Sequence, residues 1–552
     1  MDKNKIVKII SHKTMVLLYL FSSLIFSPFY FLWIFFYNIK KKIGNKYIIS
    51  LIFSVLISSI FIMLQFPYIS SLWIDEWISI KSAEVFFSNN FPYLESGNPL
   101  SYGFAYFGLL SIFIKFFNNW IHSGRILNLL LFNISVFLIF HCIKKTINTK
   151  IAFWSCVVLL FSNFSFLMVN EIRGYVFTLF LYSILFALFI NYKKLNKIFV
   201  FLFSLITMAI LVDNHITNLL LIAIFMLYFY IYVIFYNRKY KFVLIFPVFL
   251  FIILILVSYK GNFWGAINFL FNKLTGNQKI EWLISNSENN ILSSFISPYK
   301  FLFENTIFSY FNLFFLILSI LSCFFILDKR HSVKYIIVAL TILLYLIPIS
   351  LNNVGEVGSR YYFIILPFFS IMLSLGLVTF LDIFKNKKFK YLFPLFIYTI
   401  ALFSGLYNIQ NVKWAKTINF KEIAEIIKVN KSENTFFITN IMGLPIDFYG
   451  IKIDFILNEK ATYSYYQNKN RFGKTNFMGF TYNAPVGHNS VINAKYIKYE
   501  ELDLFLKNNK NVIIMIRPWS SDITDKTYKT IKDNNFKNIS PKENPLLLFI
   551  KS

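Results

Sequence analysis

The chain has 552 residues, of which 57% are hydrophobic and 20% aromatic, while only 14% are charged. Its mean hydropathy is +0.60. This composition excludes a soluble globular protein and predicts a polytopic membrane protein. The net charge of +28 comes largely from Lys runs that alternate with apolar segments. That pattern is typical of the cytoplasmic ends of membrane spans and argues against a nucleic-acid-binding surface.

Apolar segments of about 20 residues, the length needed to cross a bilayer, follow one another along the chain. The first is too long for the core of a cleavable signal peptide, and it either spans the membrane or lies in the interface. The sequence therefore predicts an α-helical bundle of about eleven or twelve transmembrane helices. The segments fall near 14–37, 48–69, 124–143, 151–168, 174–190, 198–212, 216–235, 242–258, 307–327, 335–351, 361–381 and 391–408.

The loops between these segments alternate between a basic set and a set that carries acidic and mixed polar clusters. The positive-inside rule places the basic set in the cytoplasm and every polar cluster outside. We therefore expect a multi-pass protein of the inner (cytoplasmic) membrane with one polar site on its outer face. The basic loops contain Lys40 to Lys42, Lys144 and Lys145, Lys193 and Lys194, Arg238 and Lys239, Lys329 and Arg330, and Lys385 to Lys390.

The three cysteines lie inside or at the edge of apolar segments, at Cys142, Cys156 and Cys323. They are interpreted as packing residues, because nothing in their spacing indicates a disulfide or a zinc site.

From about residue 412 the composition changes, and helix-like and strand-like pieces alternate. Helices are predicted at 420–429, 500–507 and 525–533, and strands at 435–439, 512–516 and 546–550. This alternation predicts an extracytoplasmic α/β domain over 412–552, after a transmembrane domain over 1–411. The domain lacks the GxGxxG and GxxxxGK[ST] motifs, so no nucleotide site is predicted.

The long first outer loop, 72–123, carries two adjacent carboxylates, Asp75 and Glu76. In a functional interpretation Asp75 is a general base, and Glu76 tunes its pKa or binds a cation. The alternative is a solvated pair that caps a helix beginning at Trp77, where negative charge suits the helix dipole. Trp73 and Trp77 are interpreted as aromatic residues of the membrane interface. Helices are predicted over 77–87 and 102–117, before Arg125 opens the next span.

Two further clusters lie in tight outer turns. Glu171 and Arg173 either form a local ion pair, or Arg173 binds a phosphate with its planar guanidinium. Asp213 precedes His215, which is either a hydrogen-bonded structural residue or a ligand for phosphate or a metal. Because no His-rich spacing supports a tight zinc site, the dependence on a divalent metal stays open.

A fourth cluster, Gly358-Ser359-Arg360-Tyr361, opens a late span. Arg360 could extend its guanidinium to the membrane surface. Together with backbone N–H groups at the start of a helix, it would also form a good cradle for a phosphate. We favour the second interpretation.

Taken together, these features resemble the GT-C superfamily of glycosyltransferases, in particular the branch with the protein O-mannosyltransferases and the lipid A aminoarabinose transferases. The resemblance covers about Trp73 to Phe380. It rests on the Asp75-Glu76 pair, Pro99-Leu100, Arg125, Arg360-Tyr361-Tyr362 and the outward α/β domain. The usual Pro-Pro pair of that family reads Asn98-Pro99 here.

The resemblance implies an inverting transfer of a hexosyl or pentosyl group from a polyprenyl-phosphate donor to an envelope glycan, lipid or protein. Asp75 would be the catalytic carboxylate, and Arg173, Arg360 and His215 would hold the donor phosphate. Further candidates for the site are Glu171, Asp213, Arg125 and Tyr361. The sugar, the acceptor and the oligomeric state do not follow from the sequence.

Three rival functions remain. A transporter or flippase of lipid-linked sugars would carry ionisable residues deep within its spans. An O-antigen polymerase or ligase, which uses a diphosphate donor, would carry several Arg in one large outer loop, and the loop 259–305 has none. A structural assembly protein would leave Asp75, Arg173 and Arg360 without a shared purpose.

Overall fold

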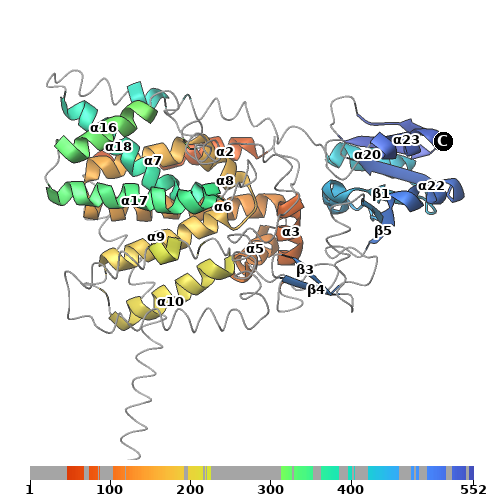
Figure 1. The fold of residues 1–552 in the computed structure, drawn as a ribbon, viewed down its shortest axis with the longest axis horizontal. Helices are drawn as coiled ribbons and strands as arrows, with labels where there is room; N and C mark the ends of the chain where they lie inside the picture. The colour runs from red at the N-terminus through yellow and green to blue at the C-terminus, as the bar shows by residue number, and fades with distance from the viewer. Residues whose placement is uncertain are drawn as a thin grey trace, which may run out of the picture.

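The chain forms a helical bundle and a C-terminal α/β domain in the computed structural model (Figure 1). The structure describes residues 46–66, 74–84, 86, 103–117, 120–191, 195, 197–214, 218, 221–224, 302, 312–325, 329–351, 362–383, 396–400, 403, 420–458, 474–477, 480–483, 494–516, 525–541 and 546–551. The fold class predicted from the sequence, a polytopic membrane bundle with a small α/β domain, is confirmed.

The bundle consists of long apolar helices. Within the described residues, α2, α6 and the helix Tyr362–Ile383 are each long and apolar enough to cross a membrane, and five further apolar helices are shorter. Many large apolar side chains point outward, as expected for helices that face lipid. The predicted segments 14–37 and 242–258, and most of 216–235, lie outside the described residues. The helices are α2 (Lys46–Gln65), α6 (Trp120–Thr146), α7 (Thr149–Phe161), α8 (Asn163–Asn170), α9 (Tyr175–Asn191), α10 (Lys197–Asn214), α16 (Asn312–Phe325), α17 (Lys329–Leu351) and α18 (Leu366–Ile383).

The segment predicted as one continuous helix over 151–168 is instead broken. The helices α7 and α8 meet at a bend of 58°. Ser162 between them has extended backbone angles, with φ −64° and ψ 132°. The Ser58 hydroxyl donates a 2.9 Å hydrogen bond to the carbonyl oxygen of Leu160. A break inside a membrane is tolerated when a neighbouring helix satisfies backbone groups in this way.

The two ends of the bundle differ in chemistry. At the basic end, the Lys145 ammonium group donates to the Asn191 side chain at 2.5 Å, which joins the ends of α6 and α9. The exposed Lys150 pairs with Asp382 of α18 at 3.1 Å. All three cysteines are buried, as predicted for packing residues. The described members of the predicted polar clusters, Glu76, Glu171, Arg173 and Asp213, lie at the other end of these helices.

The α/β domain is built on a six-stranded sheet of order β5-β2-β1-β6-β8-β7, in which the first four strands are parallel. The three helices and three strands predicted from the sequence are confirmed, whereas η3 and five strands were not foreseen. The elements are α20 (Phe420–Asn430), β1 (Phe436–Thr439), η3 (Ile441–Tyr449), β2 (Phe455–Asn458), β5 (Lys495–Lys498), α22 (Tyr499–Asn508), β6 (Val512–Ile516), α23 (Asp525–Asp533), β7 (Phe536–Asn538) and β8 (Leu547–Lys551), with a separate hairpin of β3 (Lys474–Phe477) and β4 (Phe480–Asn483).

Both faces of this sheet are covered, so its interior strands are apolar on both sides. Along β1 and β6, successive side chains alternate between two hydrophobic clusters. The α20 cluster lies on the face that α20 and η3 cover, and the α22 cluster on the face that α22 and α23 cover. Members of the α20 cluster include Phe420, Ile423, Ile427, Phe437, Ile446, Ile513 and Met515.

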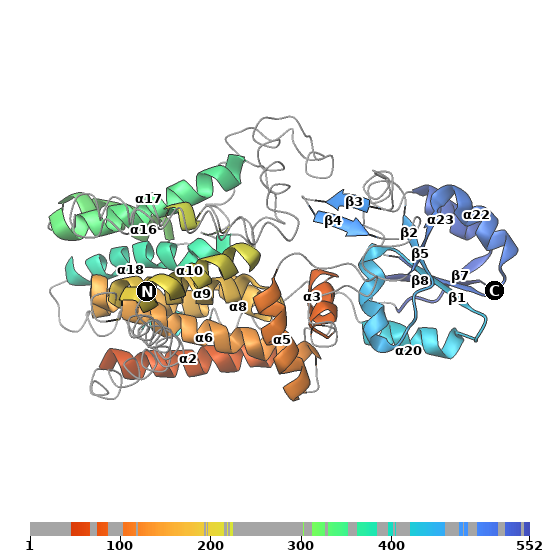
Figure 2. The ribbon, with the colours of Figure 1, turned by 90° about the horizontal axis from the view of Figure 1, so that it is seen from below.

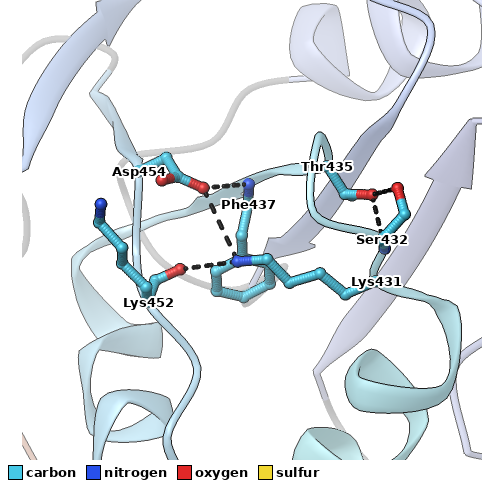
Figure 3. Close-up of polar contacts among 6 residues, drawn as sticks. All are labelled: Lys431, Ser432, Thr435, Phe437, Lys452 and Asp454. Atoms are coloured by element: carbon cyan, nitrogen blue, oxygen red, sulfur yellow. Dashed lines mark hydrogen bonds and ion pairs between the residues drawn. The ribbon is translucent and has the colours of Figure 1, made fainter.

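One carboxylate fixes the start of β1 (Figure 3). The Asp454 Oδ2 atom accepts a 2.9 Å hydrogen bond from the backbone N–H of Phe437 and lies 3.9 Å from the Lys431 ammonium nitrogen. In the preceding turn, the Thr435 hydroxyl accepts from the backbone N–H of Ser432 at 2.9 Å. The Asp454 carboxylate thus satisfies the Phe437 N–H on the β2 side, while β6 pairs with the other edge of β1 from Phe436 onward.

Replacement of Asp454 by Ala should destabilise β1. The Phe437 N–H would lose its partner, which costs about 1–3 kcal/mol. Lys431→Ala is the matched control, because it keeps the Asp454 acceptor and removes a partly exposed ion pair, worth about 1 kcal/mol or less, together with a 3.4 Å hydrogen bond to the Lys452 carbonyl. Hydrogen exchange of the β1 amides in the full-length protein measures both effects. Equal exchange in the two variants would contradict this account of Asp454.

Candidate functional site

Two helices of the first outer loop, α3 (Ile74–Glu84) and α5 (Phe104–Phe117), lie at the polar end of the bundle. Helices were predicted in both places, but α3 begins three residues earlier than expected. Asp75 and Glu76 therefore belong to its first turn, where negative charge is favourable. Of the other predicted site residues, His215, Arg360 and Tyr361 lie outside the described residues.

Glu76 connects α3 to the turn between α8 and α9. Its side chain is buried, and Oε1 accepts a 2.9 Å hydrogen bond from the backbone N–H of Ile172. The neighbours of Ile172 are Glu171 and Arg173, so this bond brings the first two predicted clusters together. The alternative interpretation of Asp75 and Glu76 as a solvated pair is thus wrong for Glu76.

Arg125 is fully buried where three helices meet. Its Nε donates to the carbonyl oxygen of Asn170, the last residue of α8, and Nη1 donates to that of Phe66, directly after α2, both at 3.3 Å. A cation is favourable at helix C-termini because the unpaired carbonyls there carry partial negative charge. Among nearby titratable groups, Glu76 interacts most strongly with Arg125. The Nη2 atom has no hydrogen-bond partner within the described part of the chain.

Asn128, one helical turn after Arg125, extends this buried network. Its Nδ2 donates a 2.6 Å hydrogen bond to the carbonyl oxygen of Glu171, and its Oδ1 accepts from the Tyr106 hydroxyl at 3.3 Å. Neither Asn128 nor Tyr106 was predicted as a site residue. A signal was present, since a polar residue three positions after Arg125 lies on the same face of a largely apolar helix.

The end of α10 joins the same network. The Asp213 carbonyl oxygen accepts a 2.9 Å hydrogen bond from the N–H of Gly103, which precedes α5. The Asn214 side chain donates to the Gly174 carbonyl at 2.7 Å and to the Thr178 hydroxyl at 2.6 Å. A Cβ at Gly174 would overlap the Asn214 amide, so glycine is required there. The turn that carries Glu171 and Arg173 is thereby held from two sides.

Arg173 is half-buried, and its guanidinium lies 5.3 Å from the centre of the Tyr175 ring. Tyr106 interacts electrostatically with Glu76, Arg173 and Glu171. The structure therefore gathers five of the predicted residues at one end of the bundle, together with the helix turn that contains Asp75. These five are Glu76, Arg125, Glu171, Arg173 and Asp213.

The site combines carboxylates, guanidinium groups, amides and backbone N–H groups. Such groups can accept a proton from a hydroxyl and can bind an anion. Within the described residues, no group of three or more His, Cys, Asp or Glu side chains is arranged to hold a metal ion.

Trp77 does not lie at the membrane interface as predicted. It is fully buried in the α20 cluster of the C-terminal domain. Trp77 is buried because α3 packs against η3. An interpretation of the first-loop sequence alone could not include this packing.

Replacement of Glu76 by Ala should lower the thermal stability of the protein. The Ile172 N–H would lose its acceptor, at about 1–3 kcal/mol, and the buried Arg125 would lose a favourable negative charge. Glu76→Gln retains an acceptor oxygen and should destabilise less. The measurement is thermal unfolding of the protein purified in detergent. Equal unfolding temperatures for wild type and Glu76→Ala would refute the role assigned to this carboxylate.

Comparison with known proteins finds similarity in structure but not in sequence. No protein-family model and no curated protein matches the sequence. Two structures of ArnT from Cupriavidus metallidurans each share 10% identity with this chain and cover 90% of it. The one bound to undecaprenyl phosphate has a TM-score of 0.52 over 98% of its own chain, and the apo form 0.53 over 97%. Archaeal oligosaccharyltransferase AglB from Archaeoglobus fulgidus, in complex with an inhibitory peptide and a dolichol-phosphate, has a TM-score of 0.51 at 12% identity, over 93% of this chain and 75% of its own.

Proposed function

We propose that this chain, which has the fold of the GT-C glycosyltransferases, is an integral membrane glycosyltransferase. It would move a sugar from a polyprenyl-phosphate donor to an envelope glycan, lipid or protein on the outer face of the cytoplasmic membrane. The observation that carries the proposal is the attachment of the Asp75-Glu76 turn, through Ile172, to the turn that holds Arg173. Structures with the same fold contain undecaprenyl phosphate or a dolichol-phosphate, which supports a lipid-phosphate donor.

In the proposed reaction Asp75 is the general base. It removes the proton of the acceptor hydroxyl while the oxygen attacks the anomeric carbon of the sugar. The bond from that carbon to the phosphate oxygen breaks, and its electron pair leaves with the lipid phosphate. A single displacement of this kind inverts the anomeric configuration. Positive groups near the phosphate stabilise the developing charge, which is usually the larger contribution to catalysis.

The two adjacent carboxylates would have different tasks. Glu76 is engaged with the Ile172 N–H and balances Arg125, so it positions the turn. We propose that Asp75 does the chemistry. Arg173 would bind the donor phosphate, and Arg360 and His215 are proposed to assist it from segments of the chain that the structure does not describe.

The first experiment is complementation of a deletion strain with wild type or with Asp75→Asn. We expect a sugar to be missing from the envelope of the deletion strain and to be restored by wild type alone. Mass spectrometry of envelope glycans, glycolipids and glycoproteins identifies the product. Membrane insertion of the variant, checked by immunoblotting of the membrane fraction, is the control. Equal restoration by both proteins would favour a transporter of lipid-linked sugars over an enzyme.

A second experiment tests Arg173 with undecaprenyl phosphate as the probe. Loss of a charge-assisted hydrogen bond costs about 1.5–3 kcal/mol, which is roughly a ten- to hundred-fold rise in Kd. Arg173→Ala should therefore reduce the stabilisation that the lipid phosphate gives in thermal unfolding. Lys150→Ala, which removes an exposed positive charge at the basic end of the bundle, is the matched control. A similar loss in both variants would contradict a specific role for Arg173.

A further inference from the structure

The C-terminal domain contacts the helix that carries Asp75. In Figure 2, α3 lies between the helical bundle and the α/β domain. The contact is made by η3, which directly follows the interior strand β1. Gly443 fixes η3 to the sheet, because a Cβ at this position would overlap the Thr439 hydroxyl and would lie 2.6 Å from the Met515 methyl carbon. The segment that reaches α3 therefore packs closely against the sheet.

The two sides of α3 pack against different parts of the protein. Ile80 and Ala83 belong to the hydrophobic core of the bundle, whereas Trp77 belongs to the α20 cluster. The Trp77 ring meets Phe448 of η3 edge-on, with the ring centres 6.3 Å apart. The indole N–H has no hydrogen-bond partner within the described residues, so packing alone holds it there.

A polar contact reinforces this packing. Lys81 follows Trp77 by four residues and so lies on the same face of α3. Its ammonium nitrogen is 2.7 Å from Asp447 Oδ2 and 5.0 Å from the centre of the Phe448 ring. The two paired side chains are only 23% and 25% exposed. One basic side chain thus binds both a carboxylate and an aromatic ring of η3.

The next residue of η3, Tyr449, lies near the buried network of the site. Burial raises the pKa of Tyr449, and the nearby Arg125 opposes this shift. Phe448 and Ile78 also pack against the core of the bundle as well as against the α20 cluster. The helical bundle and the α/β domain therefore meet around α3, and Tyr449 of η3 lies near Arg125.

We infer that the C-terminal domain positions Asp75 through the contact between α3 and η3, with Lys81 and Asp447 as positioning residues. This inference rests on the proposed transferase function. An isolated helix as short as α3, with 11 residues, is marginal in water and depends on tertiary packing. Glu76 fixes its first turn to the bundle, Ile80 and Ala83 pack in the core of the bundle, and η3 holds the face that carries Trp77 and Lys81. A catalytic base displaced by about 1 Å loses roughly a hundred-fold in rate, so this second attachment matters.

The test combines hydrogen exchange with the transfer measured in complemented cells. The variants are Lys81→Ala, Asp447→Ala and the charge-swapped double variant Lys81→Asp with Asp447→Lys. Phe448→Leu is a fourth variant, which removes the ring but keeps an apolar side chain. The control is Lys507→Ala, since Lys507 pairs with Asp503 at the same 2.7 Å but within α22 alone.

We expect each single variant to accelerate exchange in both α3 and residues 441–449 and to reduce the sugar product by about ten-fold or more. The charge-swapped variant should largely restore both the slow exchange and the sugar product. Lys507→Ala should change neither the exchange nor the product. Unchanged exchange in α3 after Asp447→Ala and Phe448→Leu would overturn the contact. Faster exchange with full transfer would overturn the positioning role. Absence of transfer in wild type would instead overturn the proposed function. The exchange measurements would still show whether η3 holds α3 in place.

Discussion

The buried guanidinium of Arg125 is the charge on which the polar end of the bundle depends. Removal of this group from water is costly, and the cost is offset only while its partners stay in place. Its hydrogen-bond partners are the carbonyls at the ends of α2 and α8, and Glu76 supplies a nearby negative charge. Because a half-satisfied buried network is unfavourable, this requirement favours one arrangement of α6 with the ends of α2 and α8. Glu76 attaches α3 to the same region through Ile172.

The constraint on Glu76 explains why two carboxylates stand side by side. A single acidic residue could not hold the turn at Ile172, balance Arg125 and also accept a proton from a substrate. In the proposed reaction the pair would separate these tasks, since the engaged Glu76 fixes the helix turn to which Asp75 belongs. The same turn at Ile172 is held from the other side by Asn214 and Asn128. The proposed base therefore lies on a helix turn that the buried network fixes in place.

Sequence reasoning succeeded where a pattern is local. The amphipathic α20 and α23 and the apolar β6 lie close to their predicted bounds. It failed at Ser162, because neither Gly nor Pro marks the break between α7 and α8. The gathering of Glu76, Glu171 and Asp213 followed from topology, but their partners are largely backbone groups, which residue types do not reveal. The location of Trp77 depends on Phe448, several hundred residues later, and no local signal connects the two.

The distribution of polar groups along the helices bears on the choice between an enzyme and a transporter. A transport route would require polar side chains directed into a path across the bundle. In the described helices, several deeper hydroxyls instead bond to carbonyls of their own helix, as Ser135, Ser183, Thr341 and Ser370 do. The ionisable groups of the network gather at one end, where they bond to backbone groups and where η3 of the α/β domain packs against α3. A site confined to one surface suits a reaction in which only the phosphate and the acceptor must meet, while the lipid stays in the membrane.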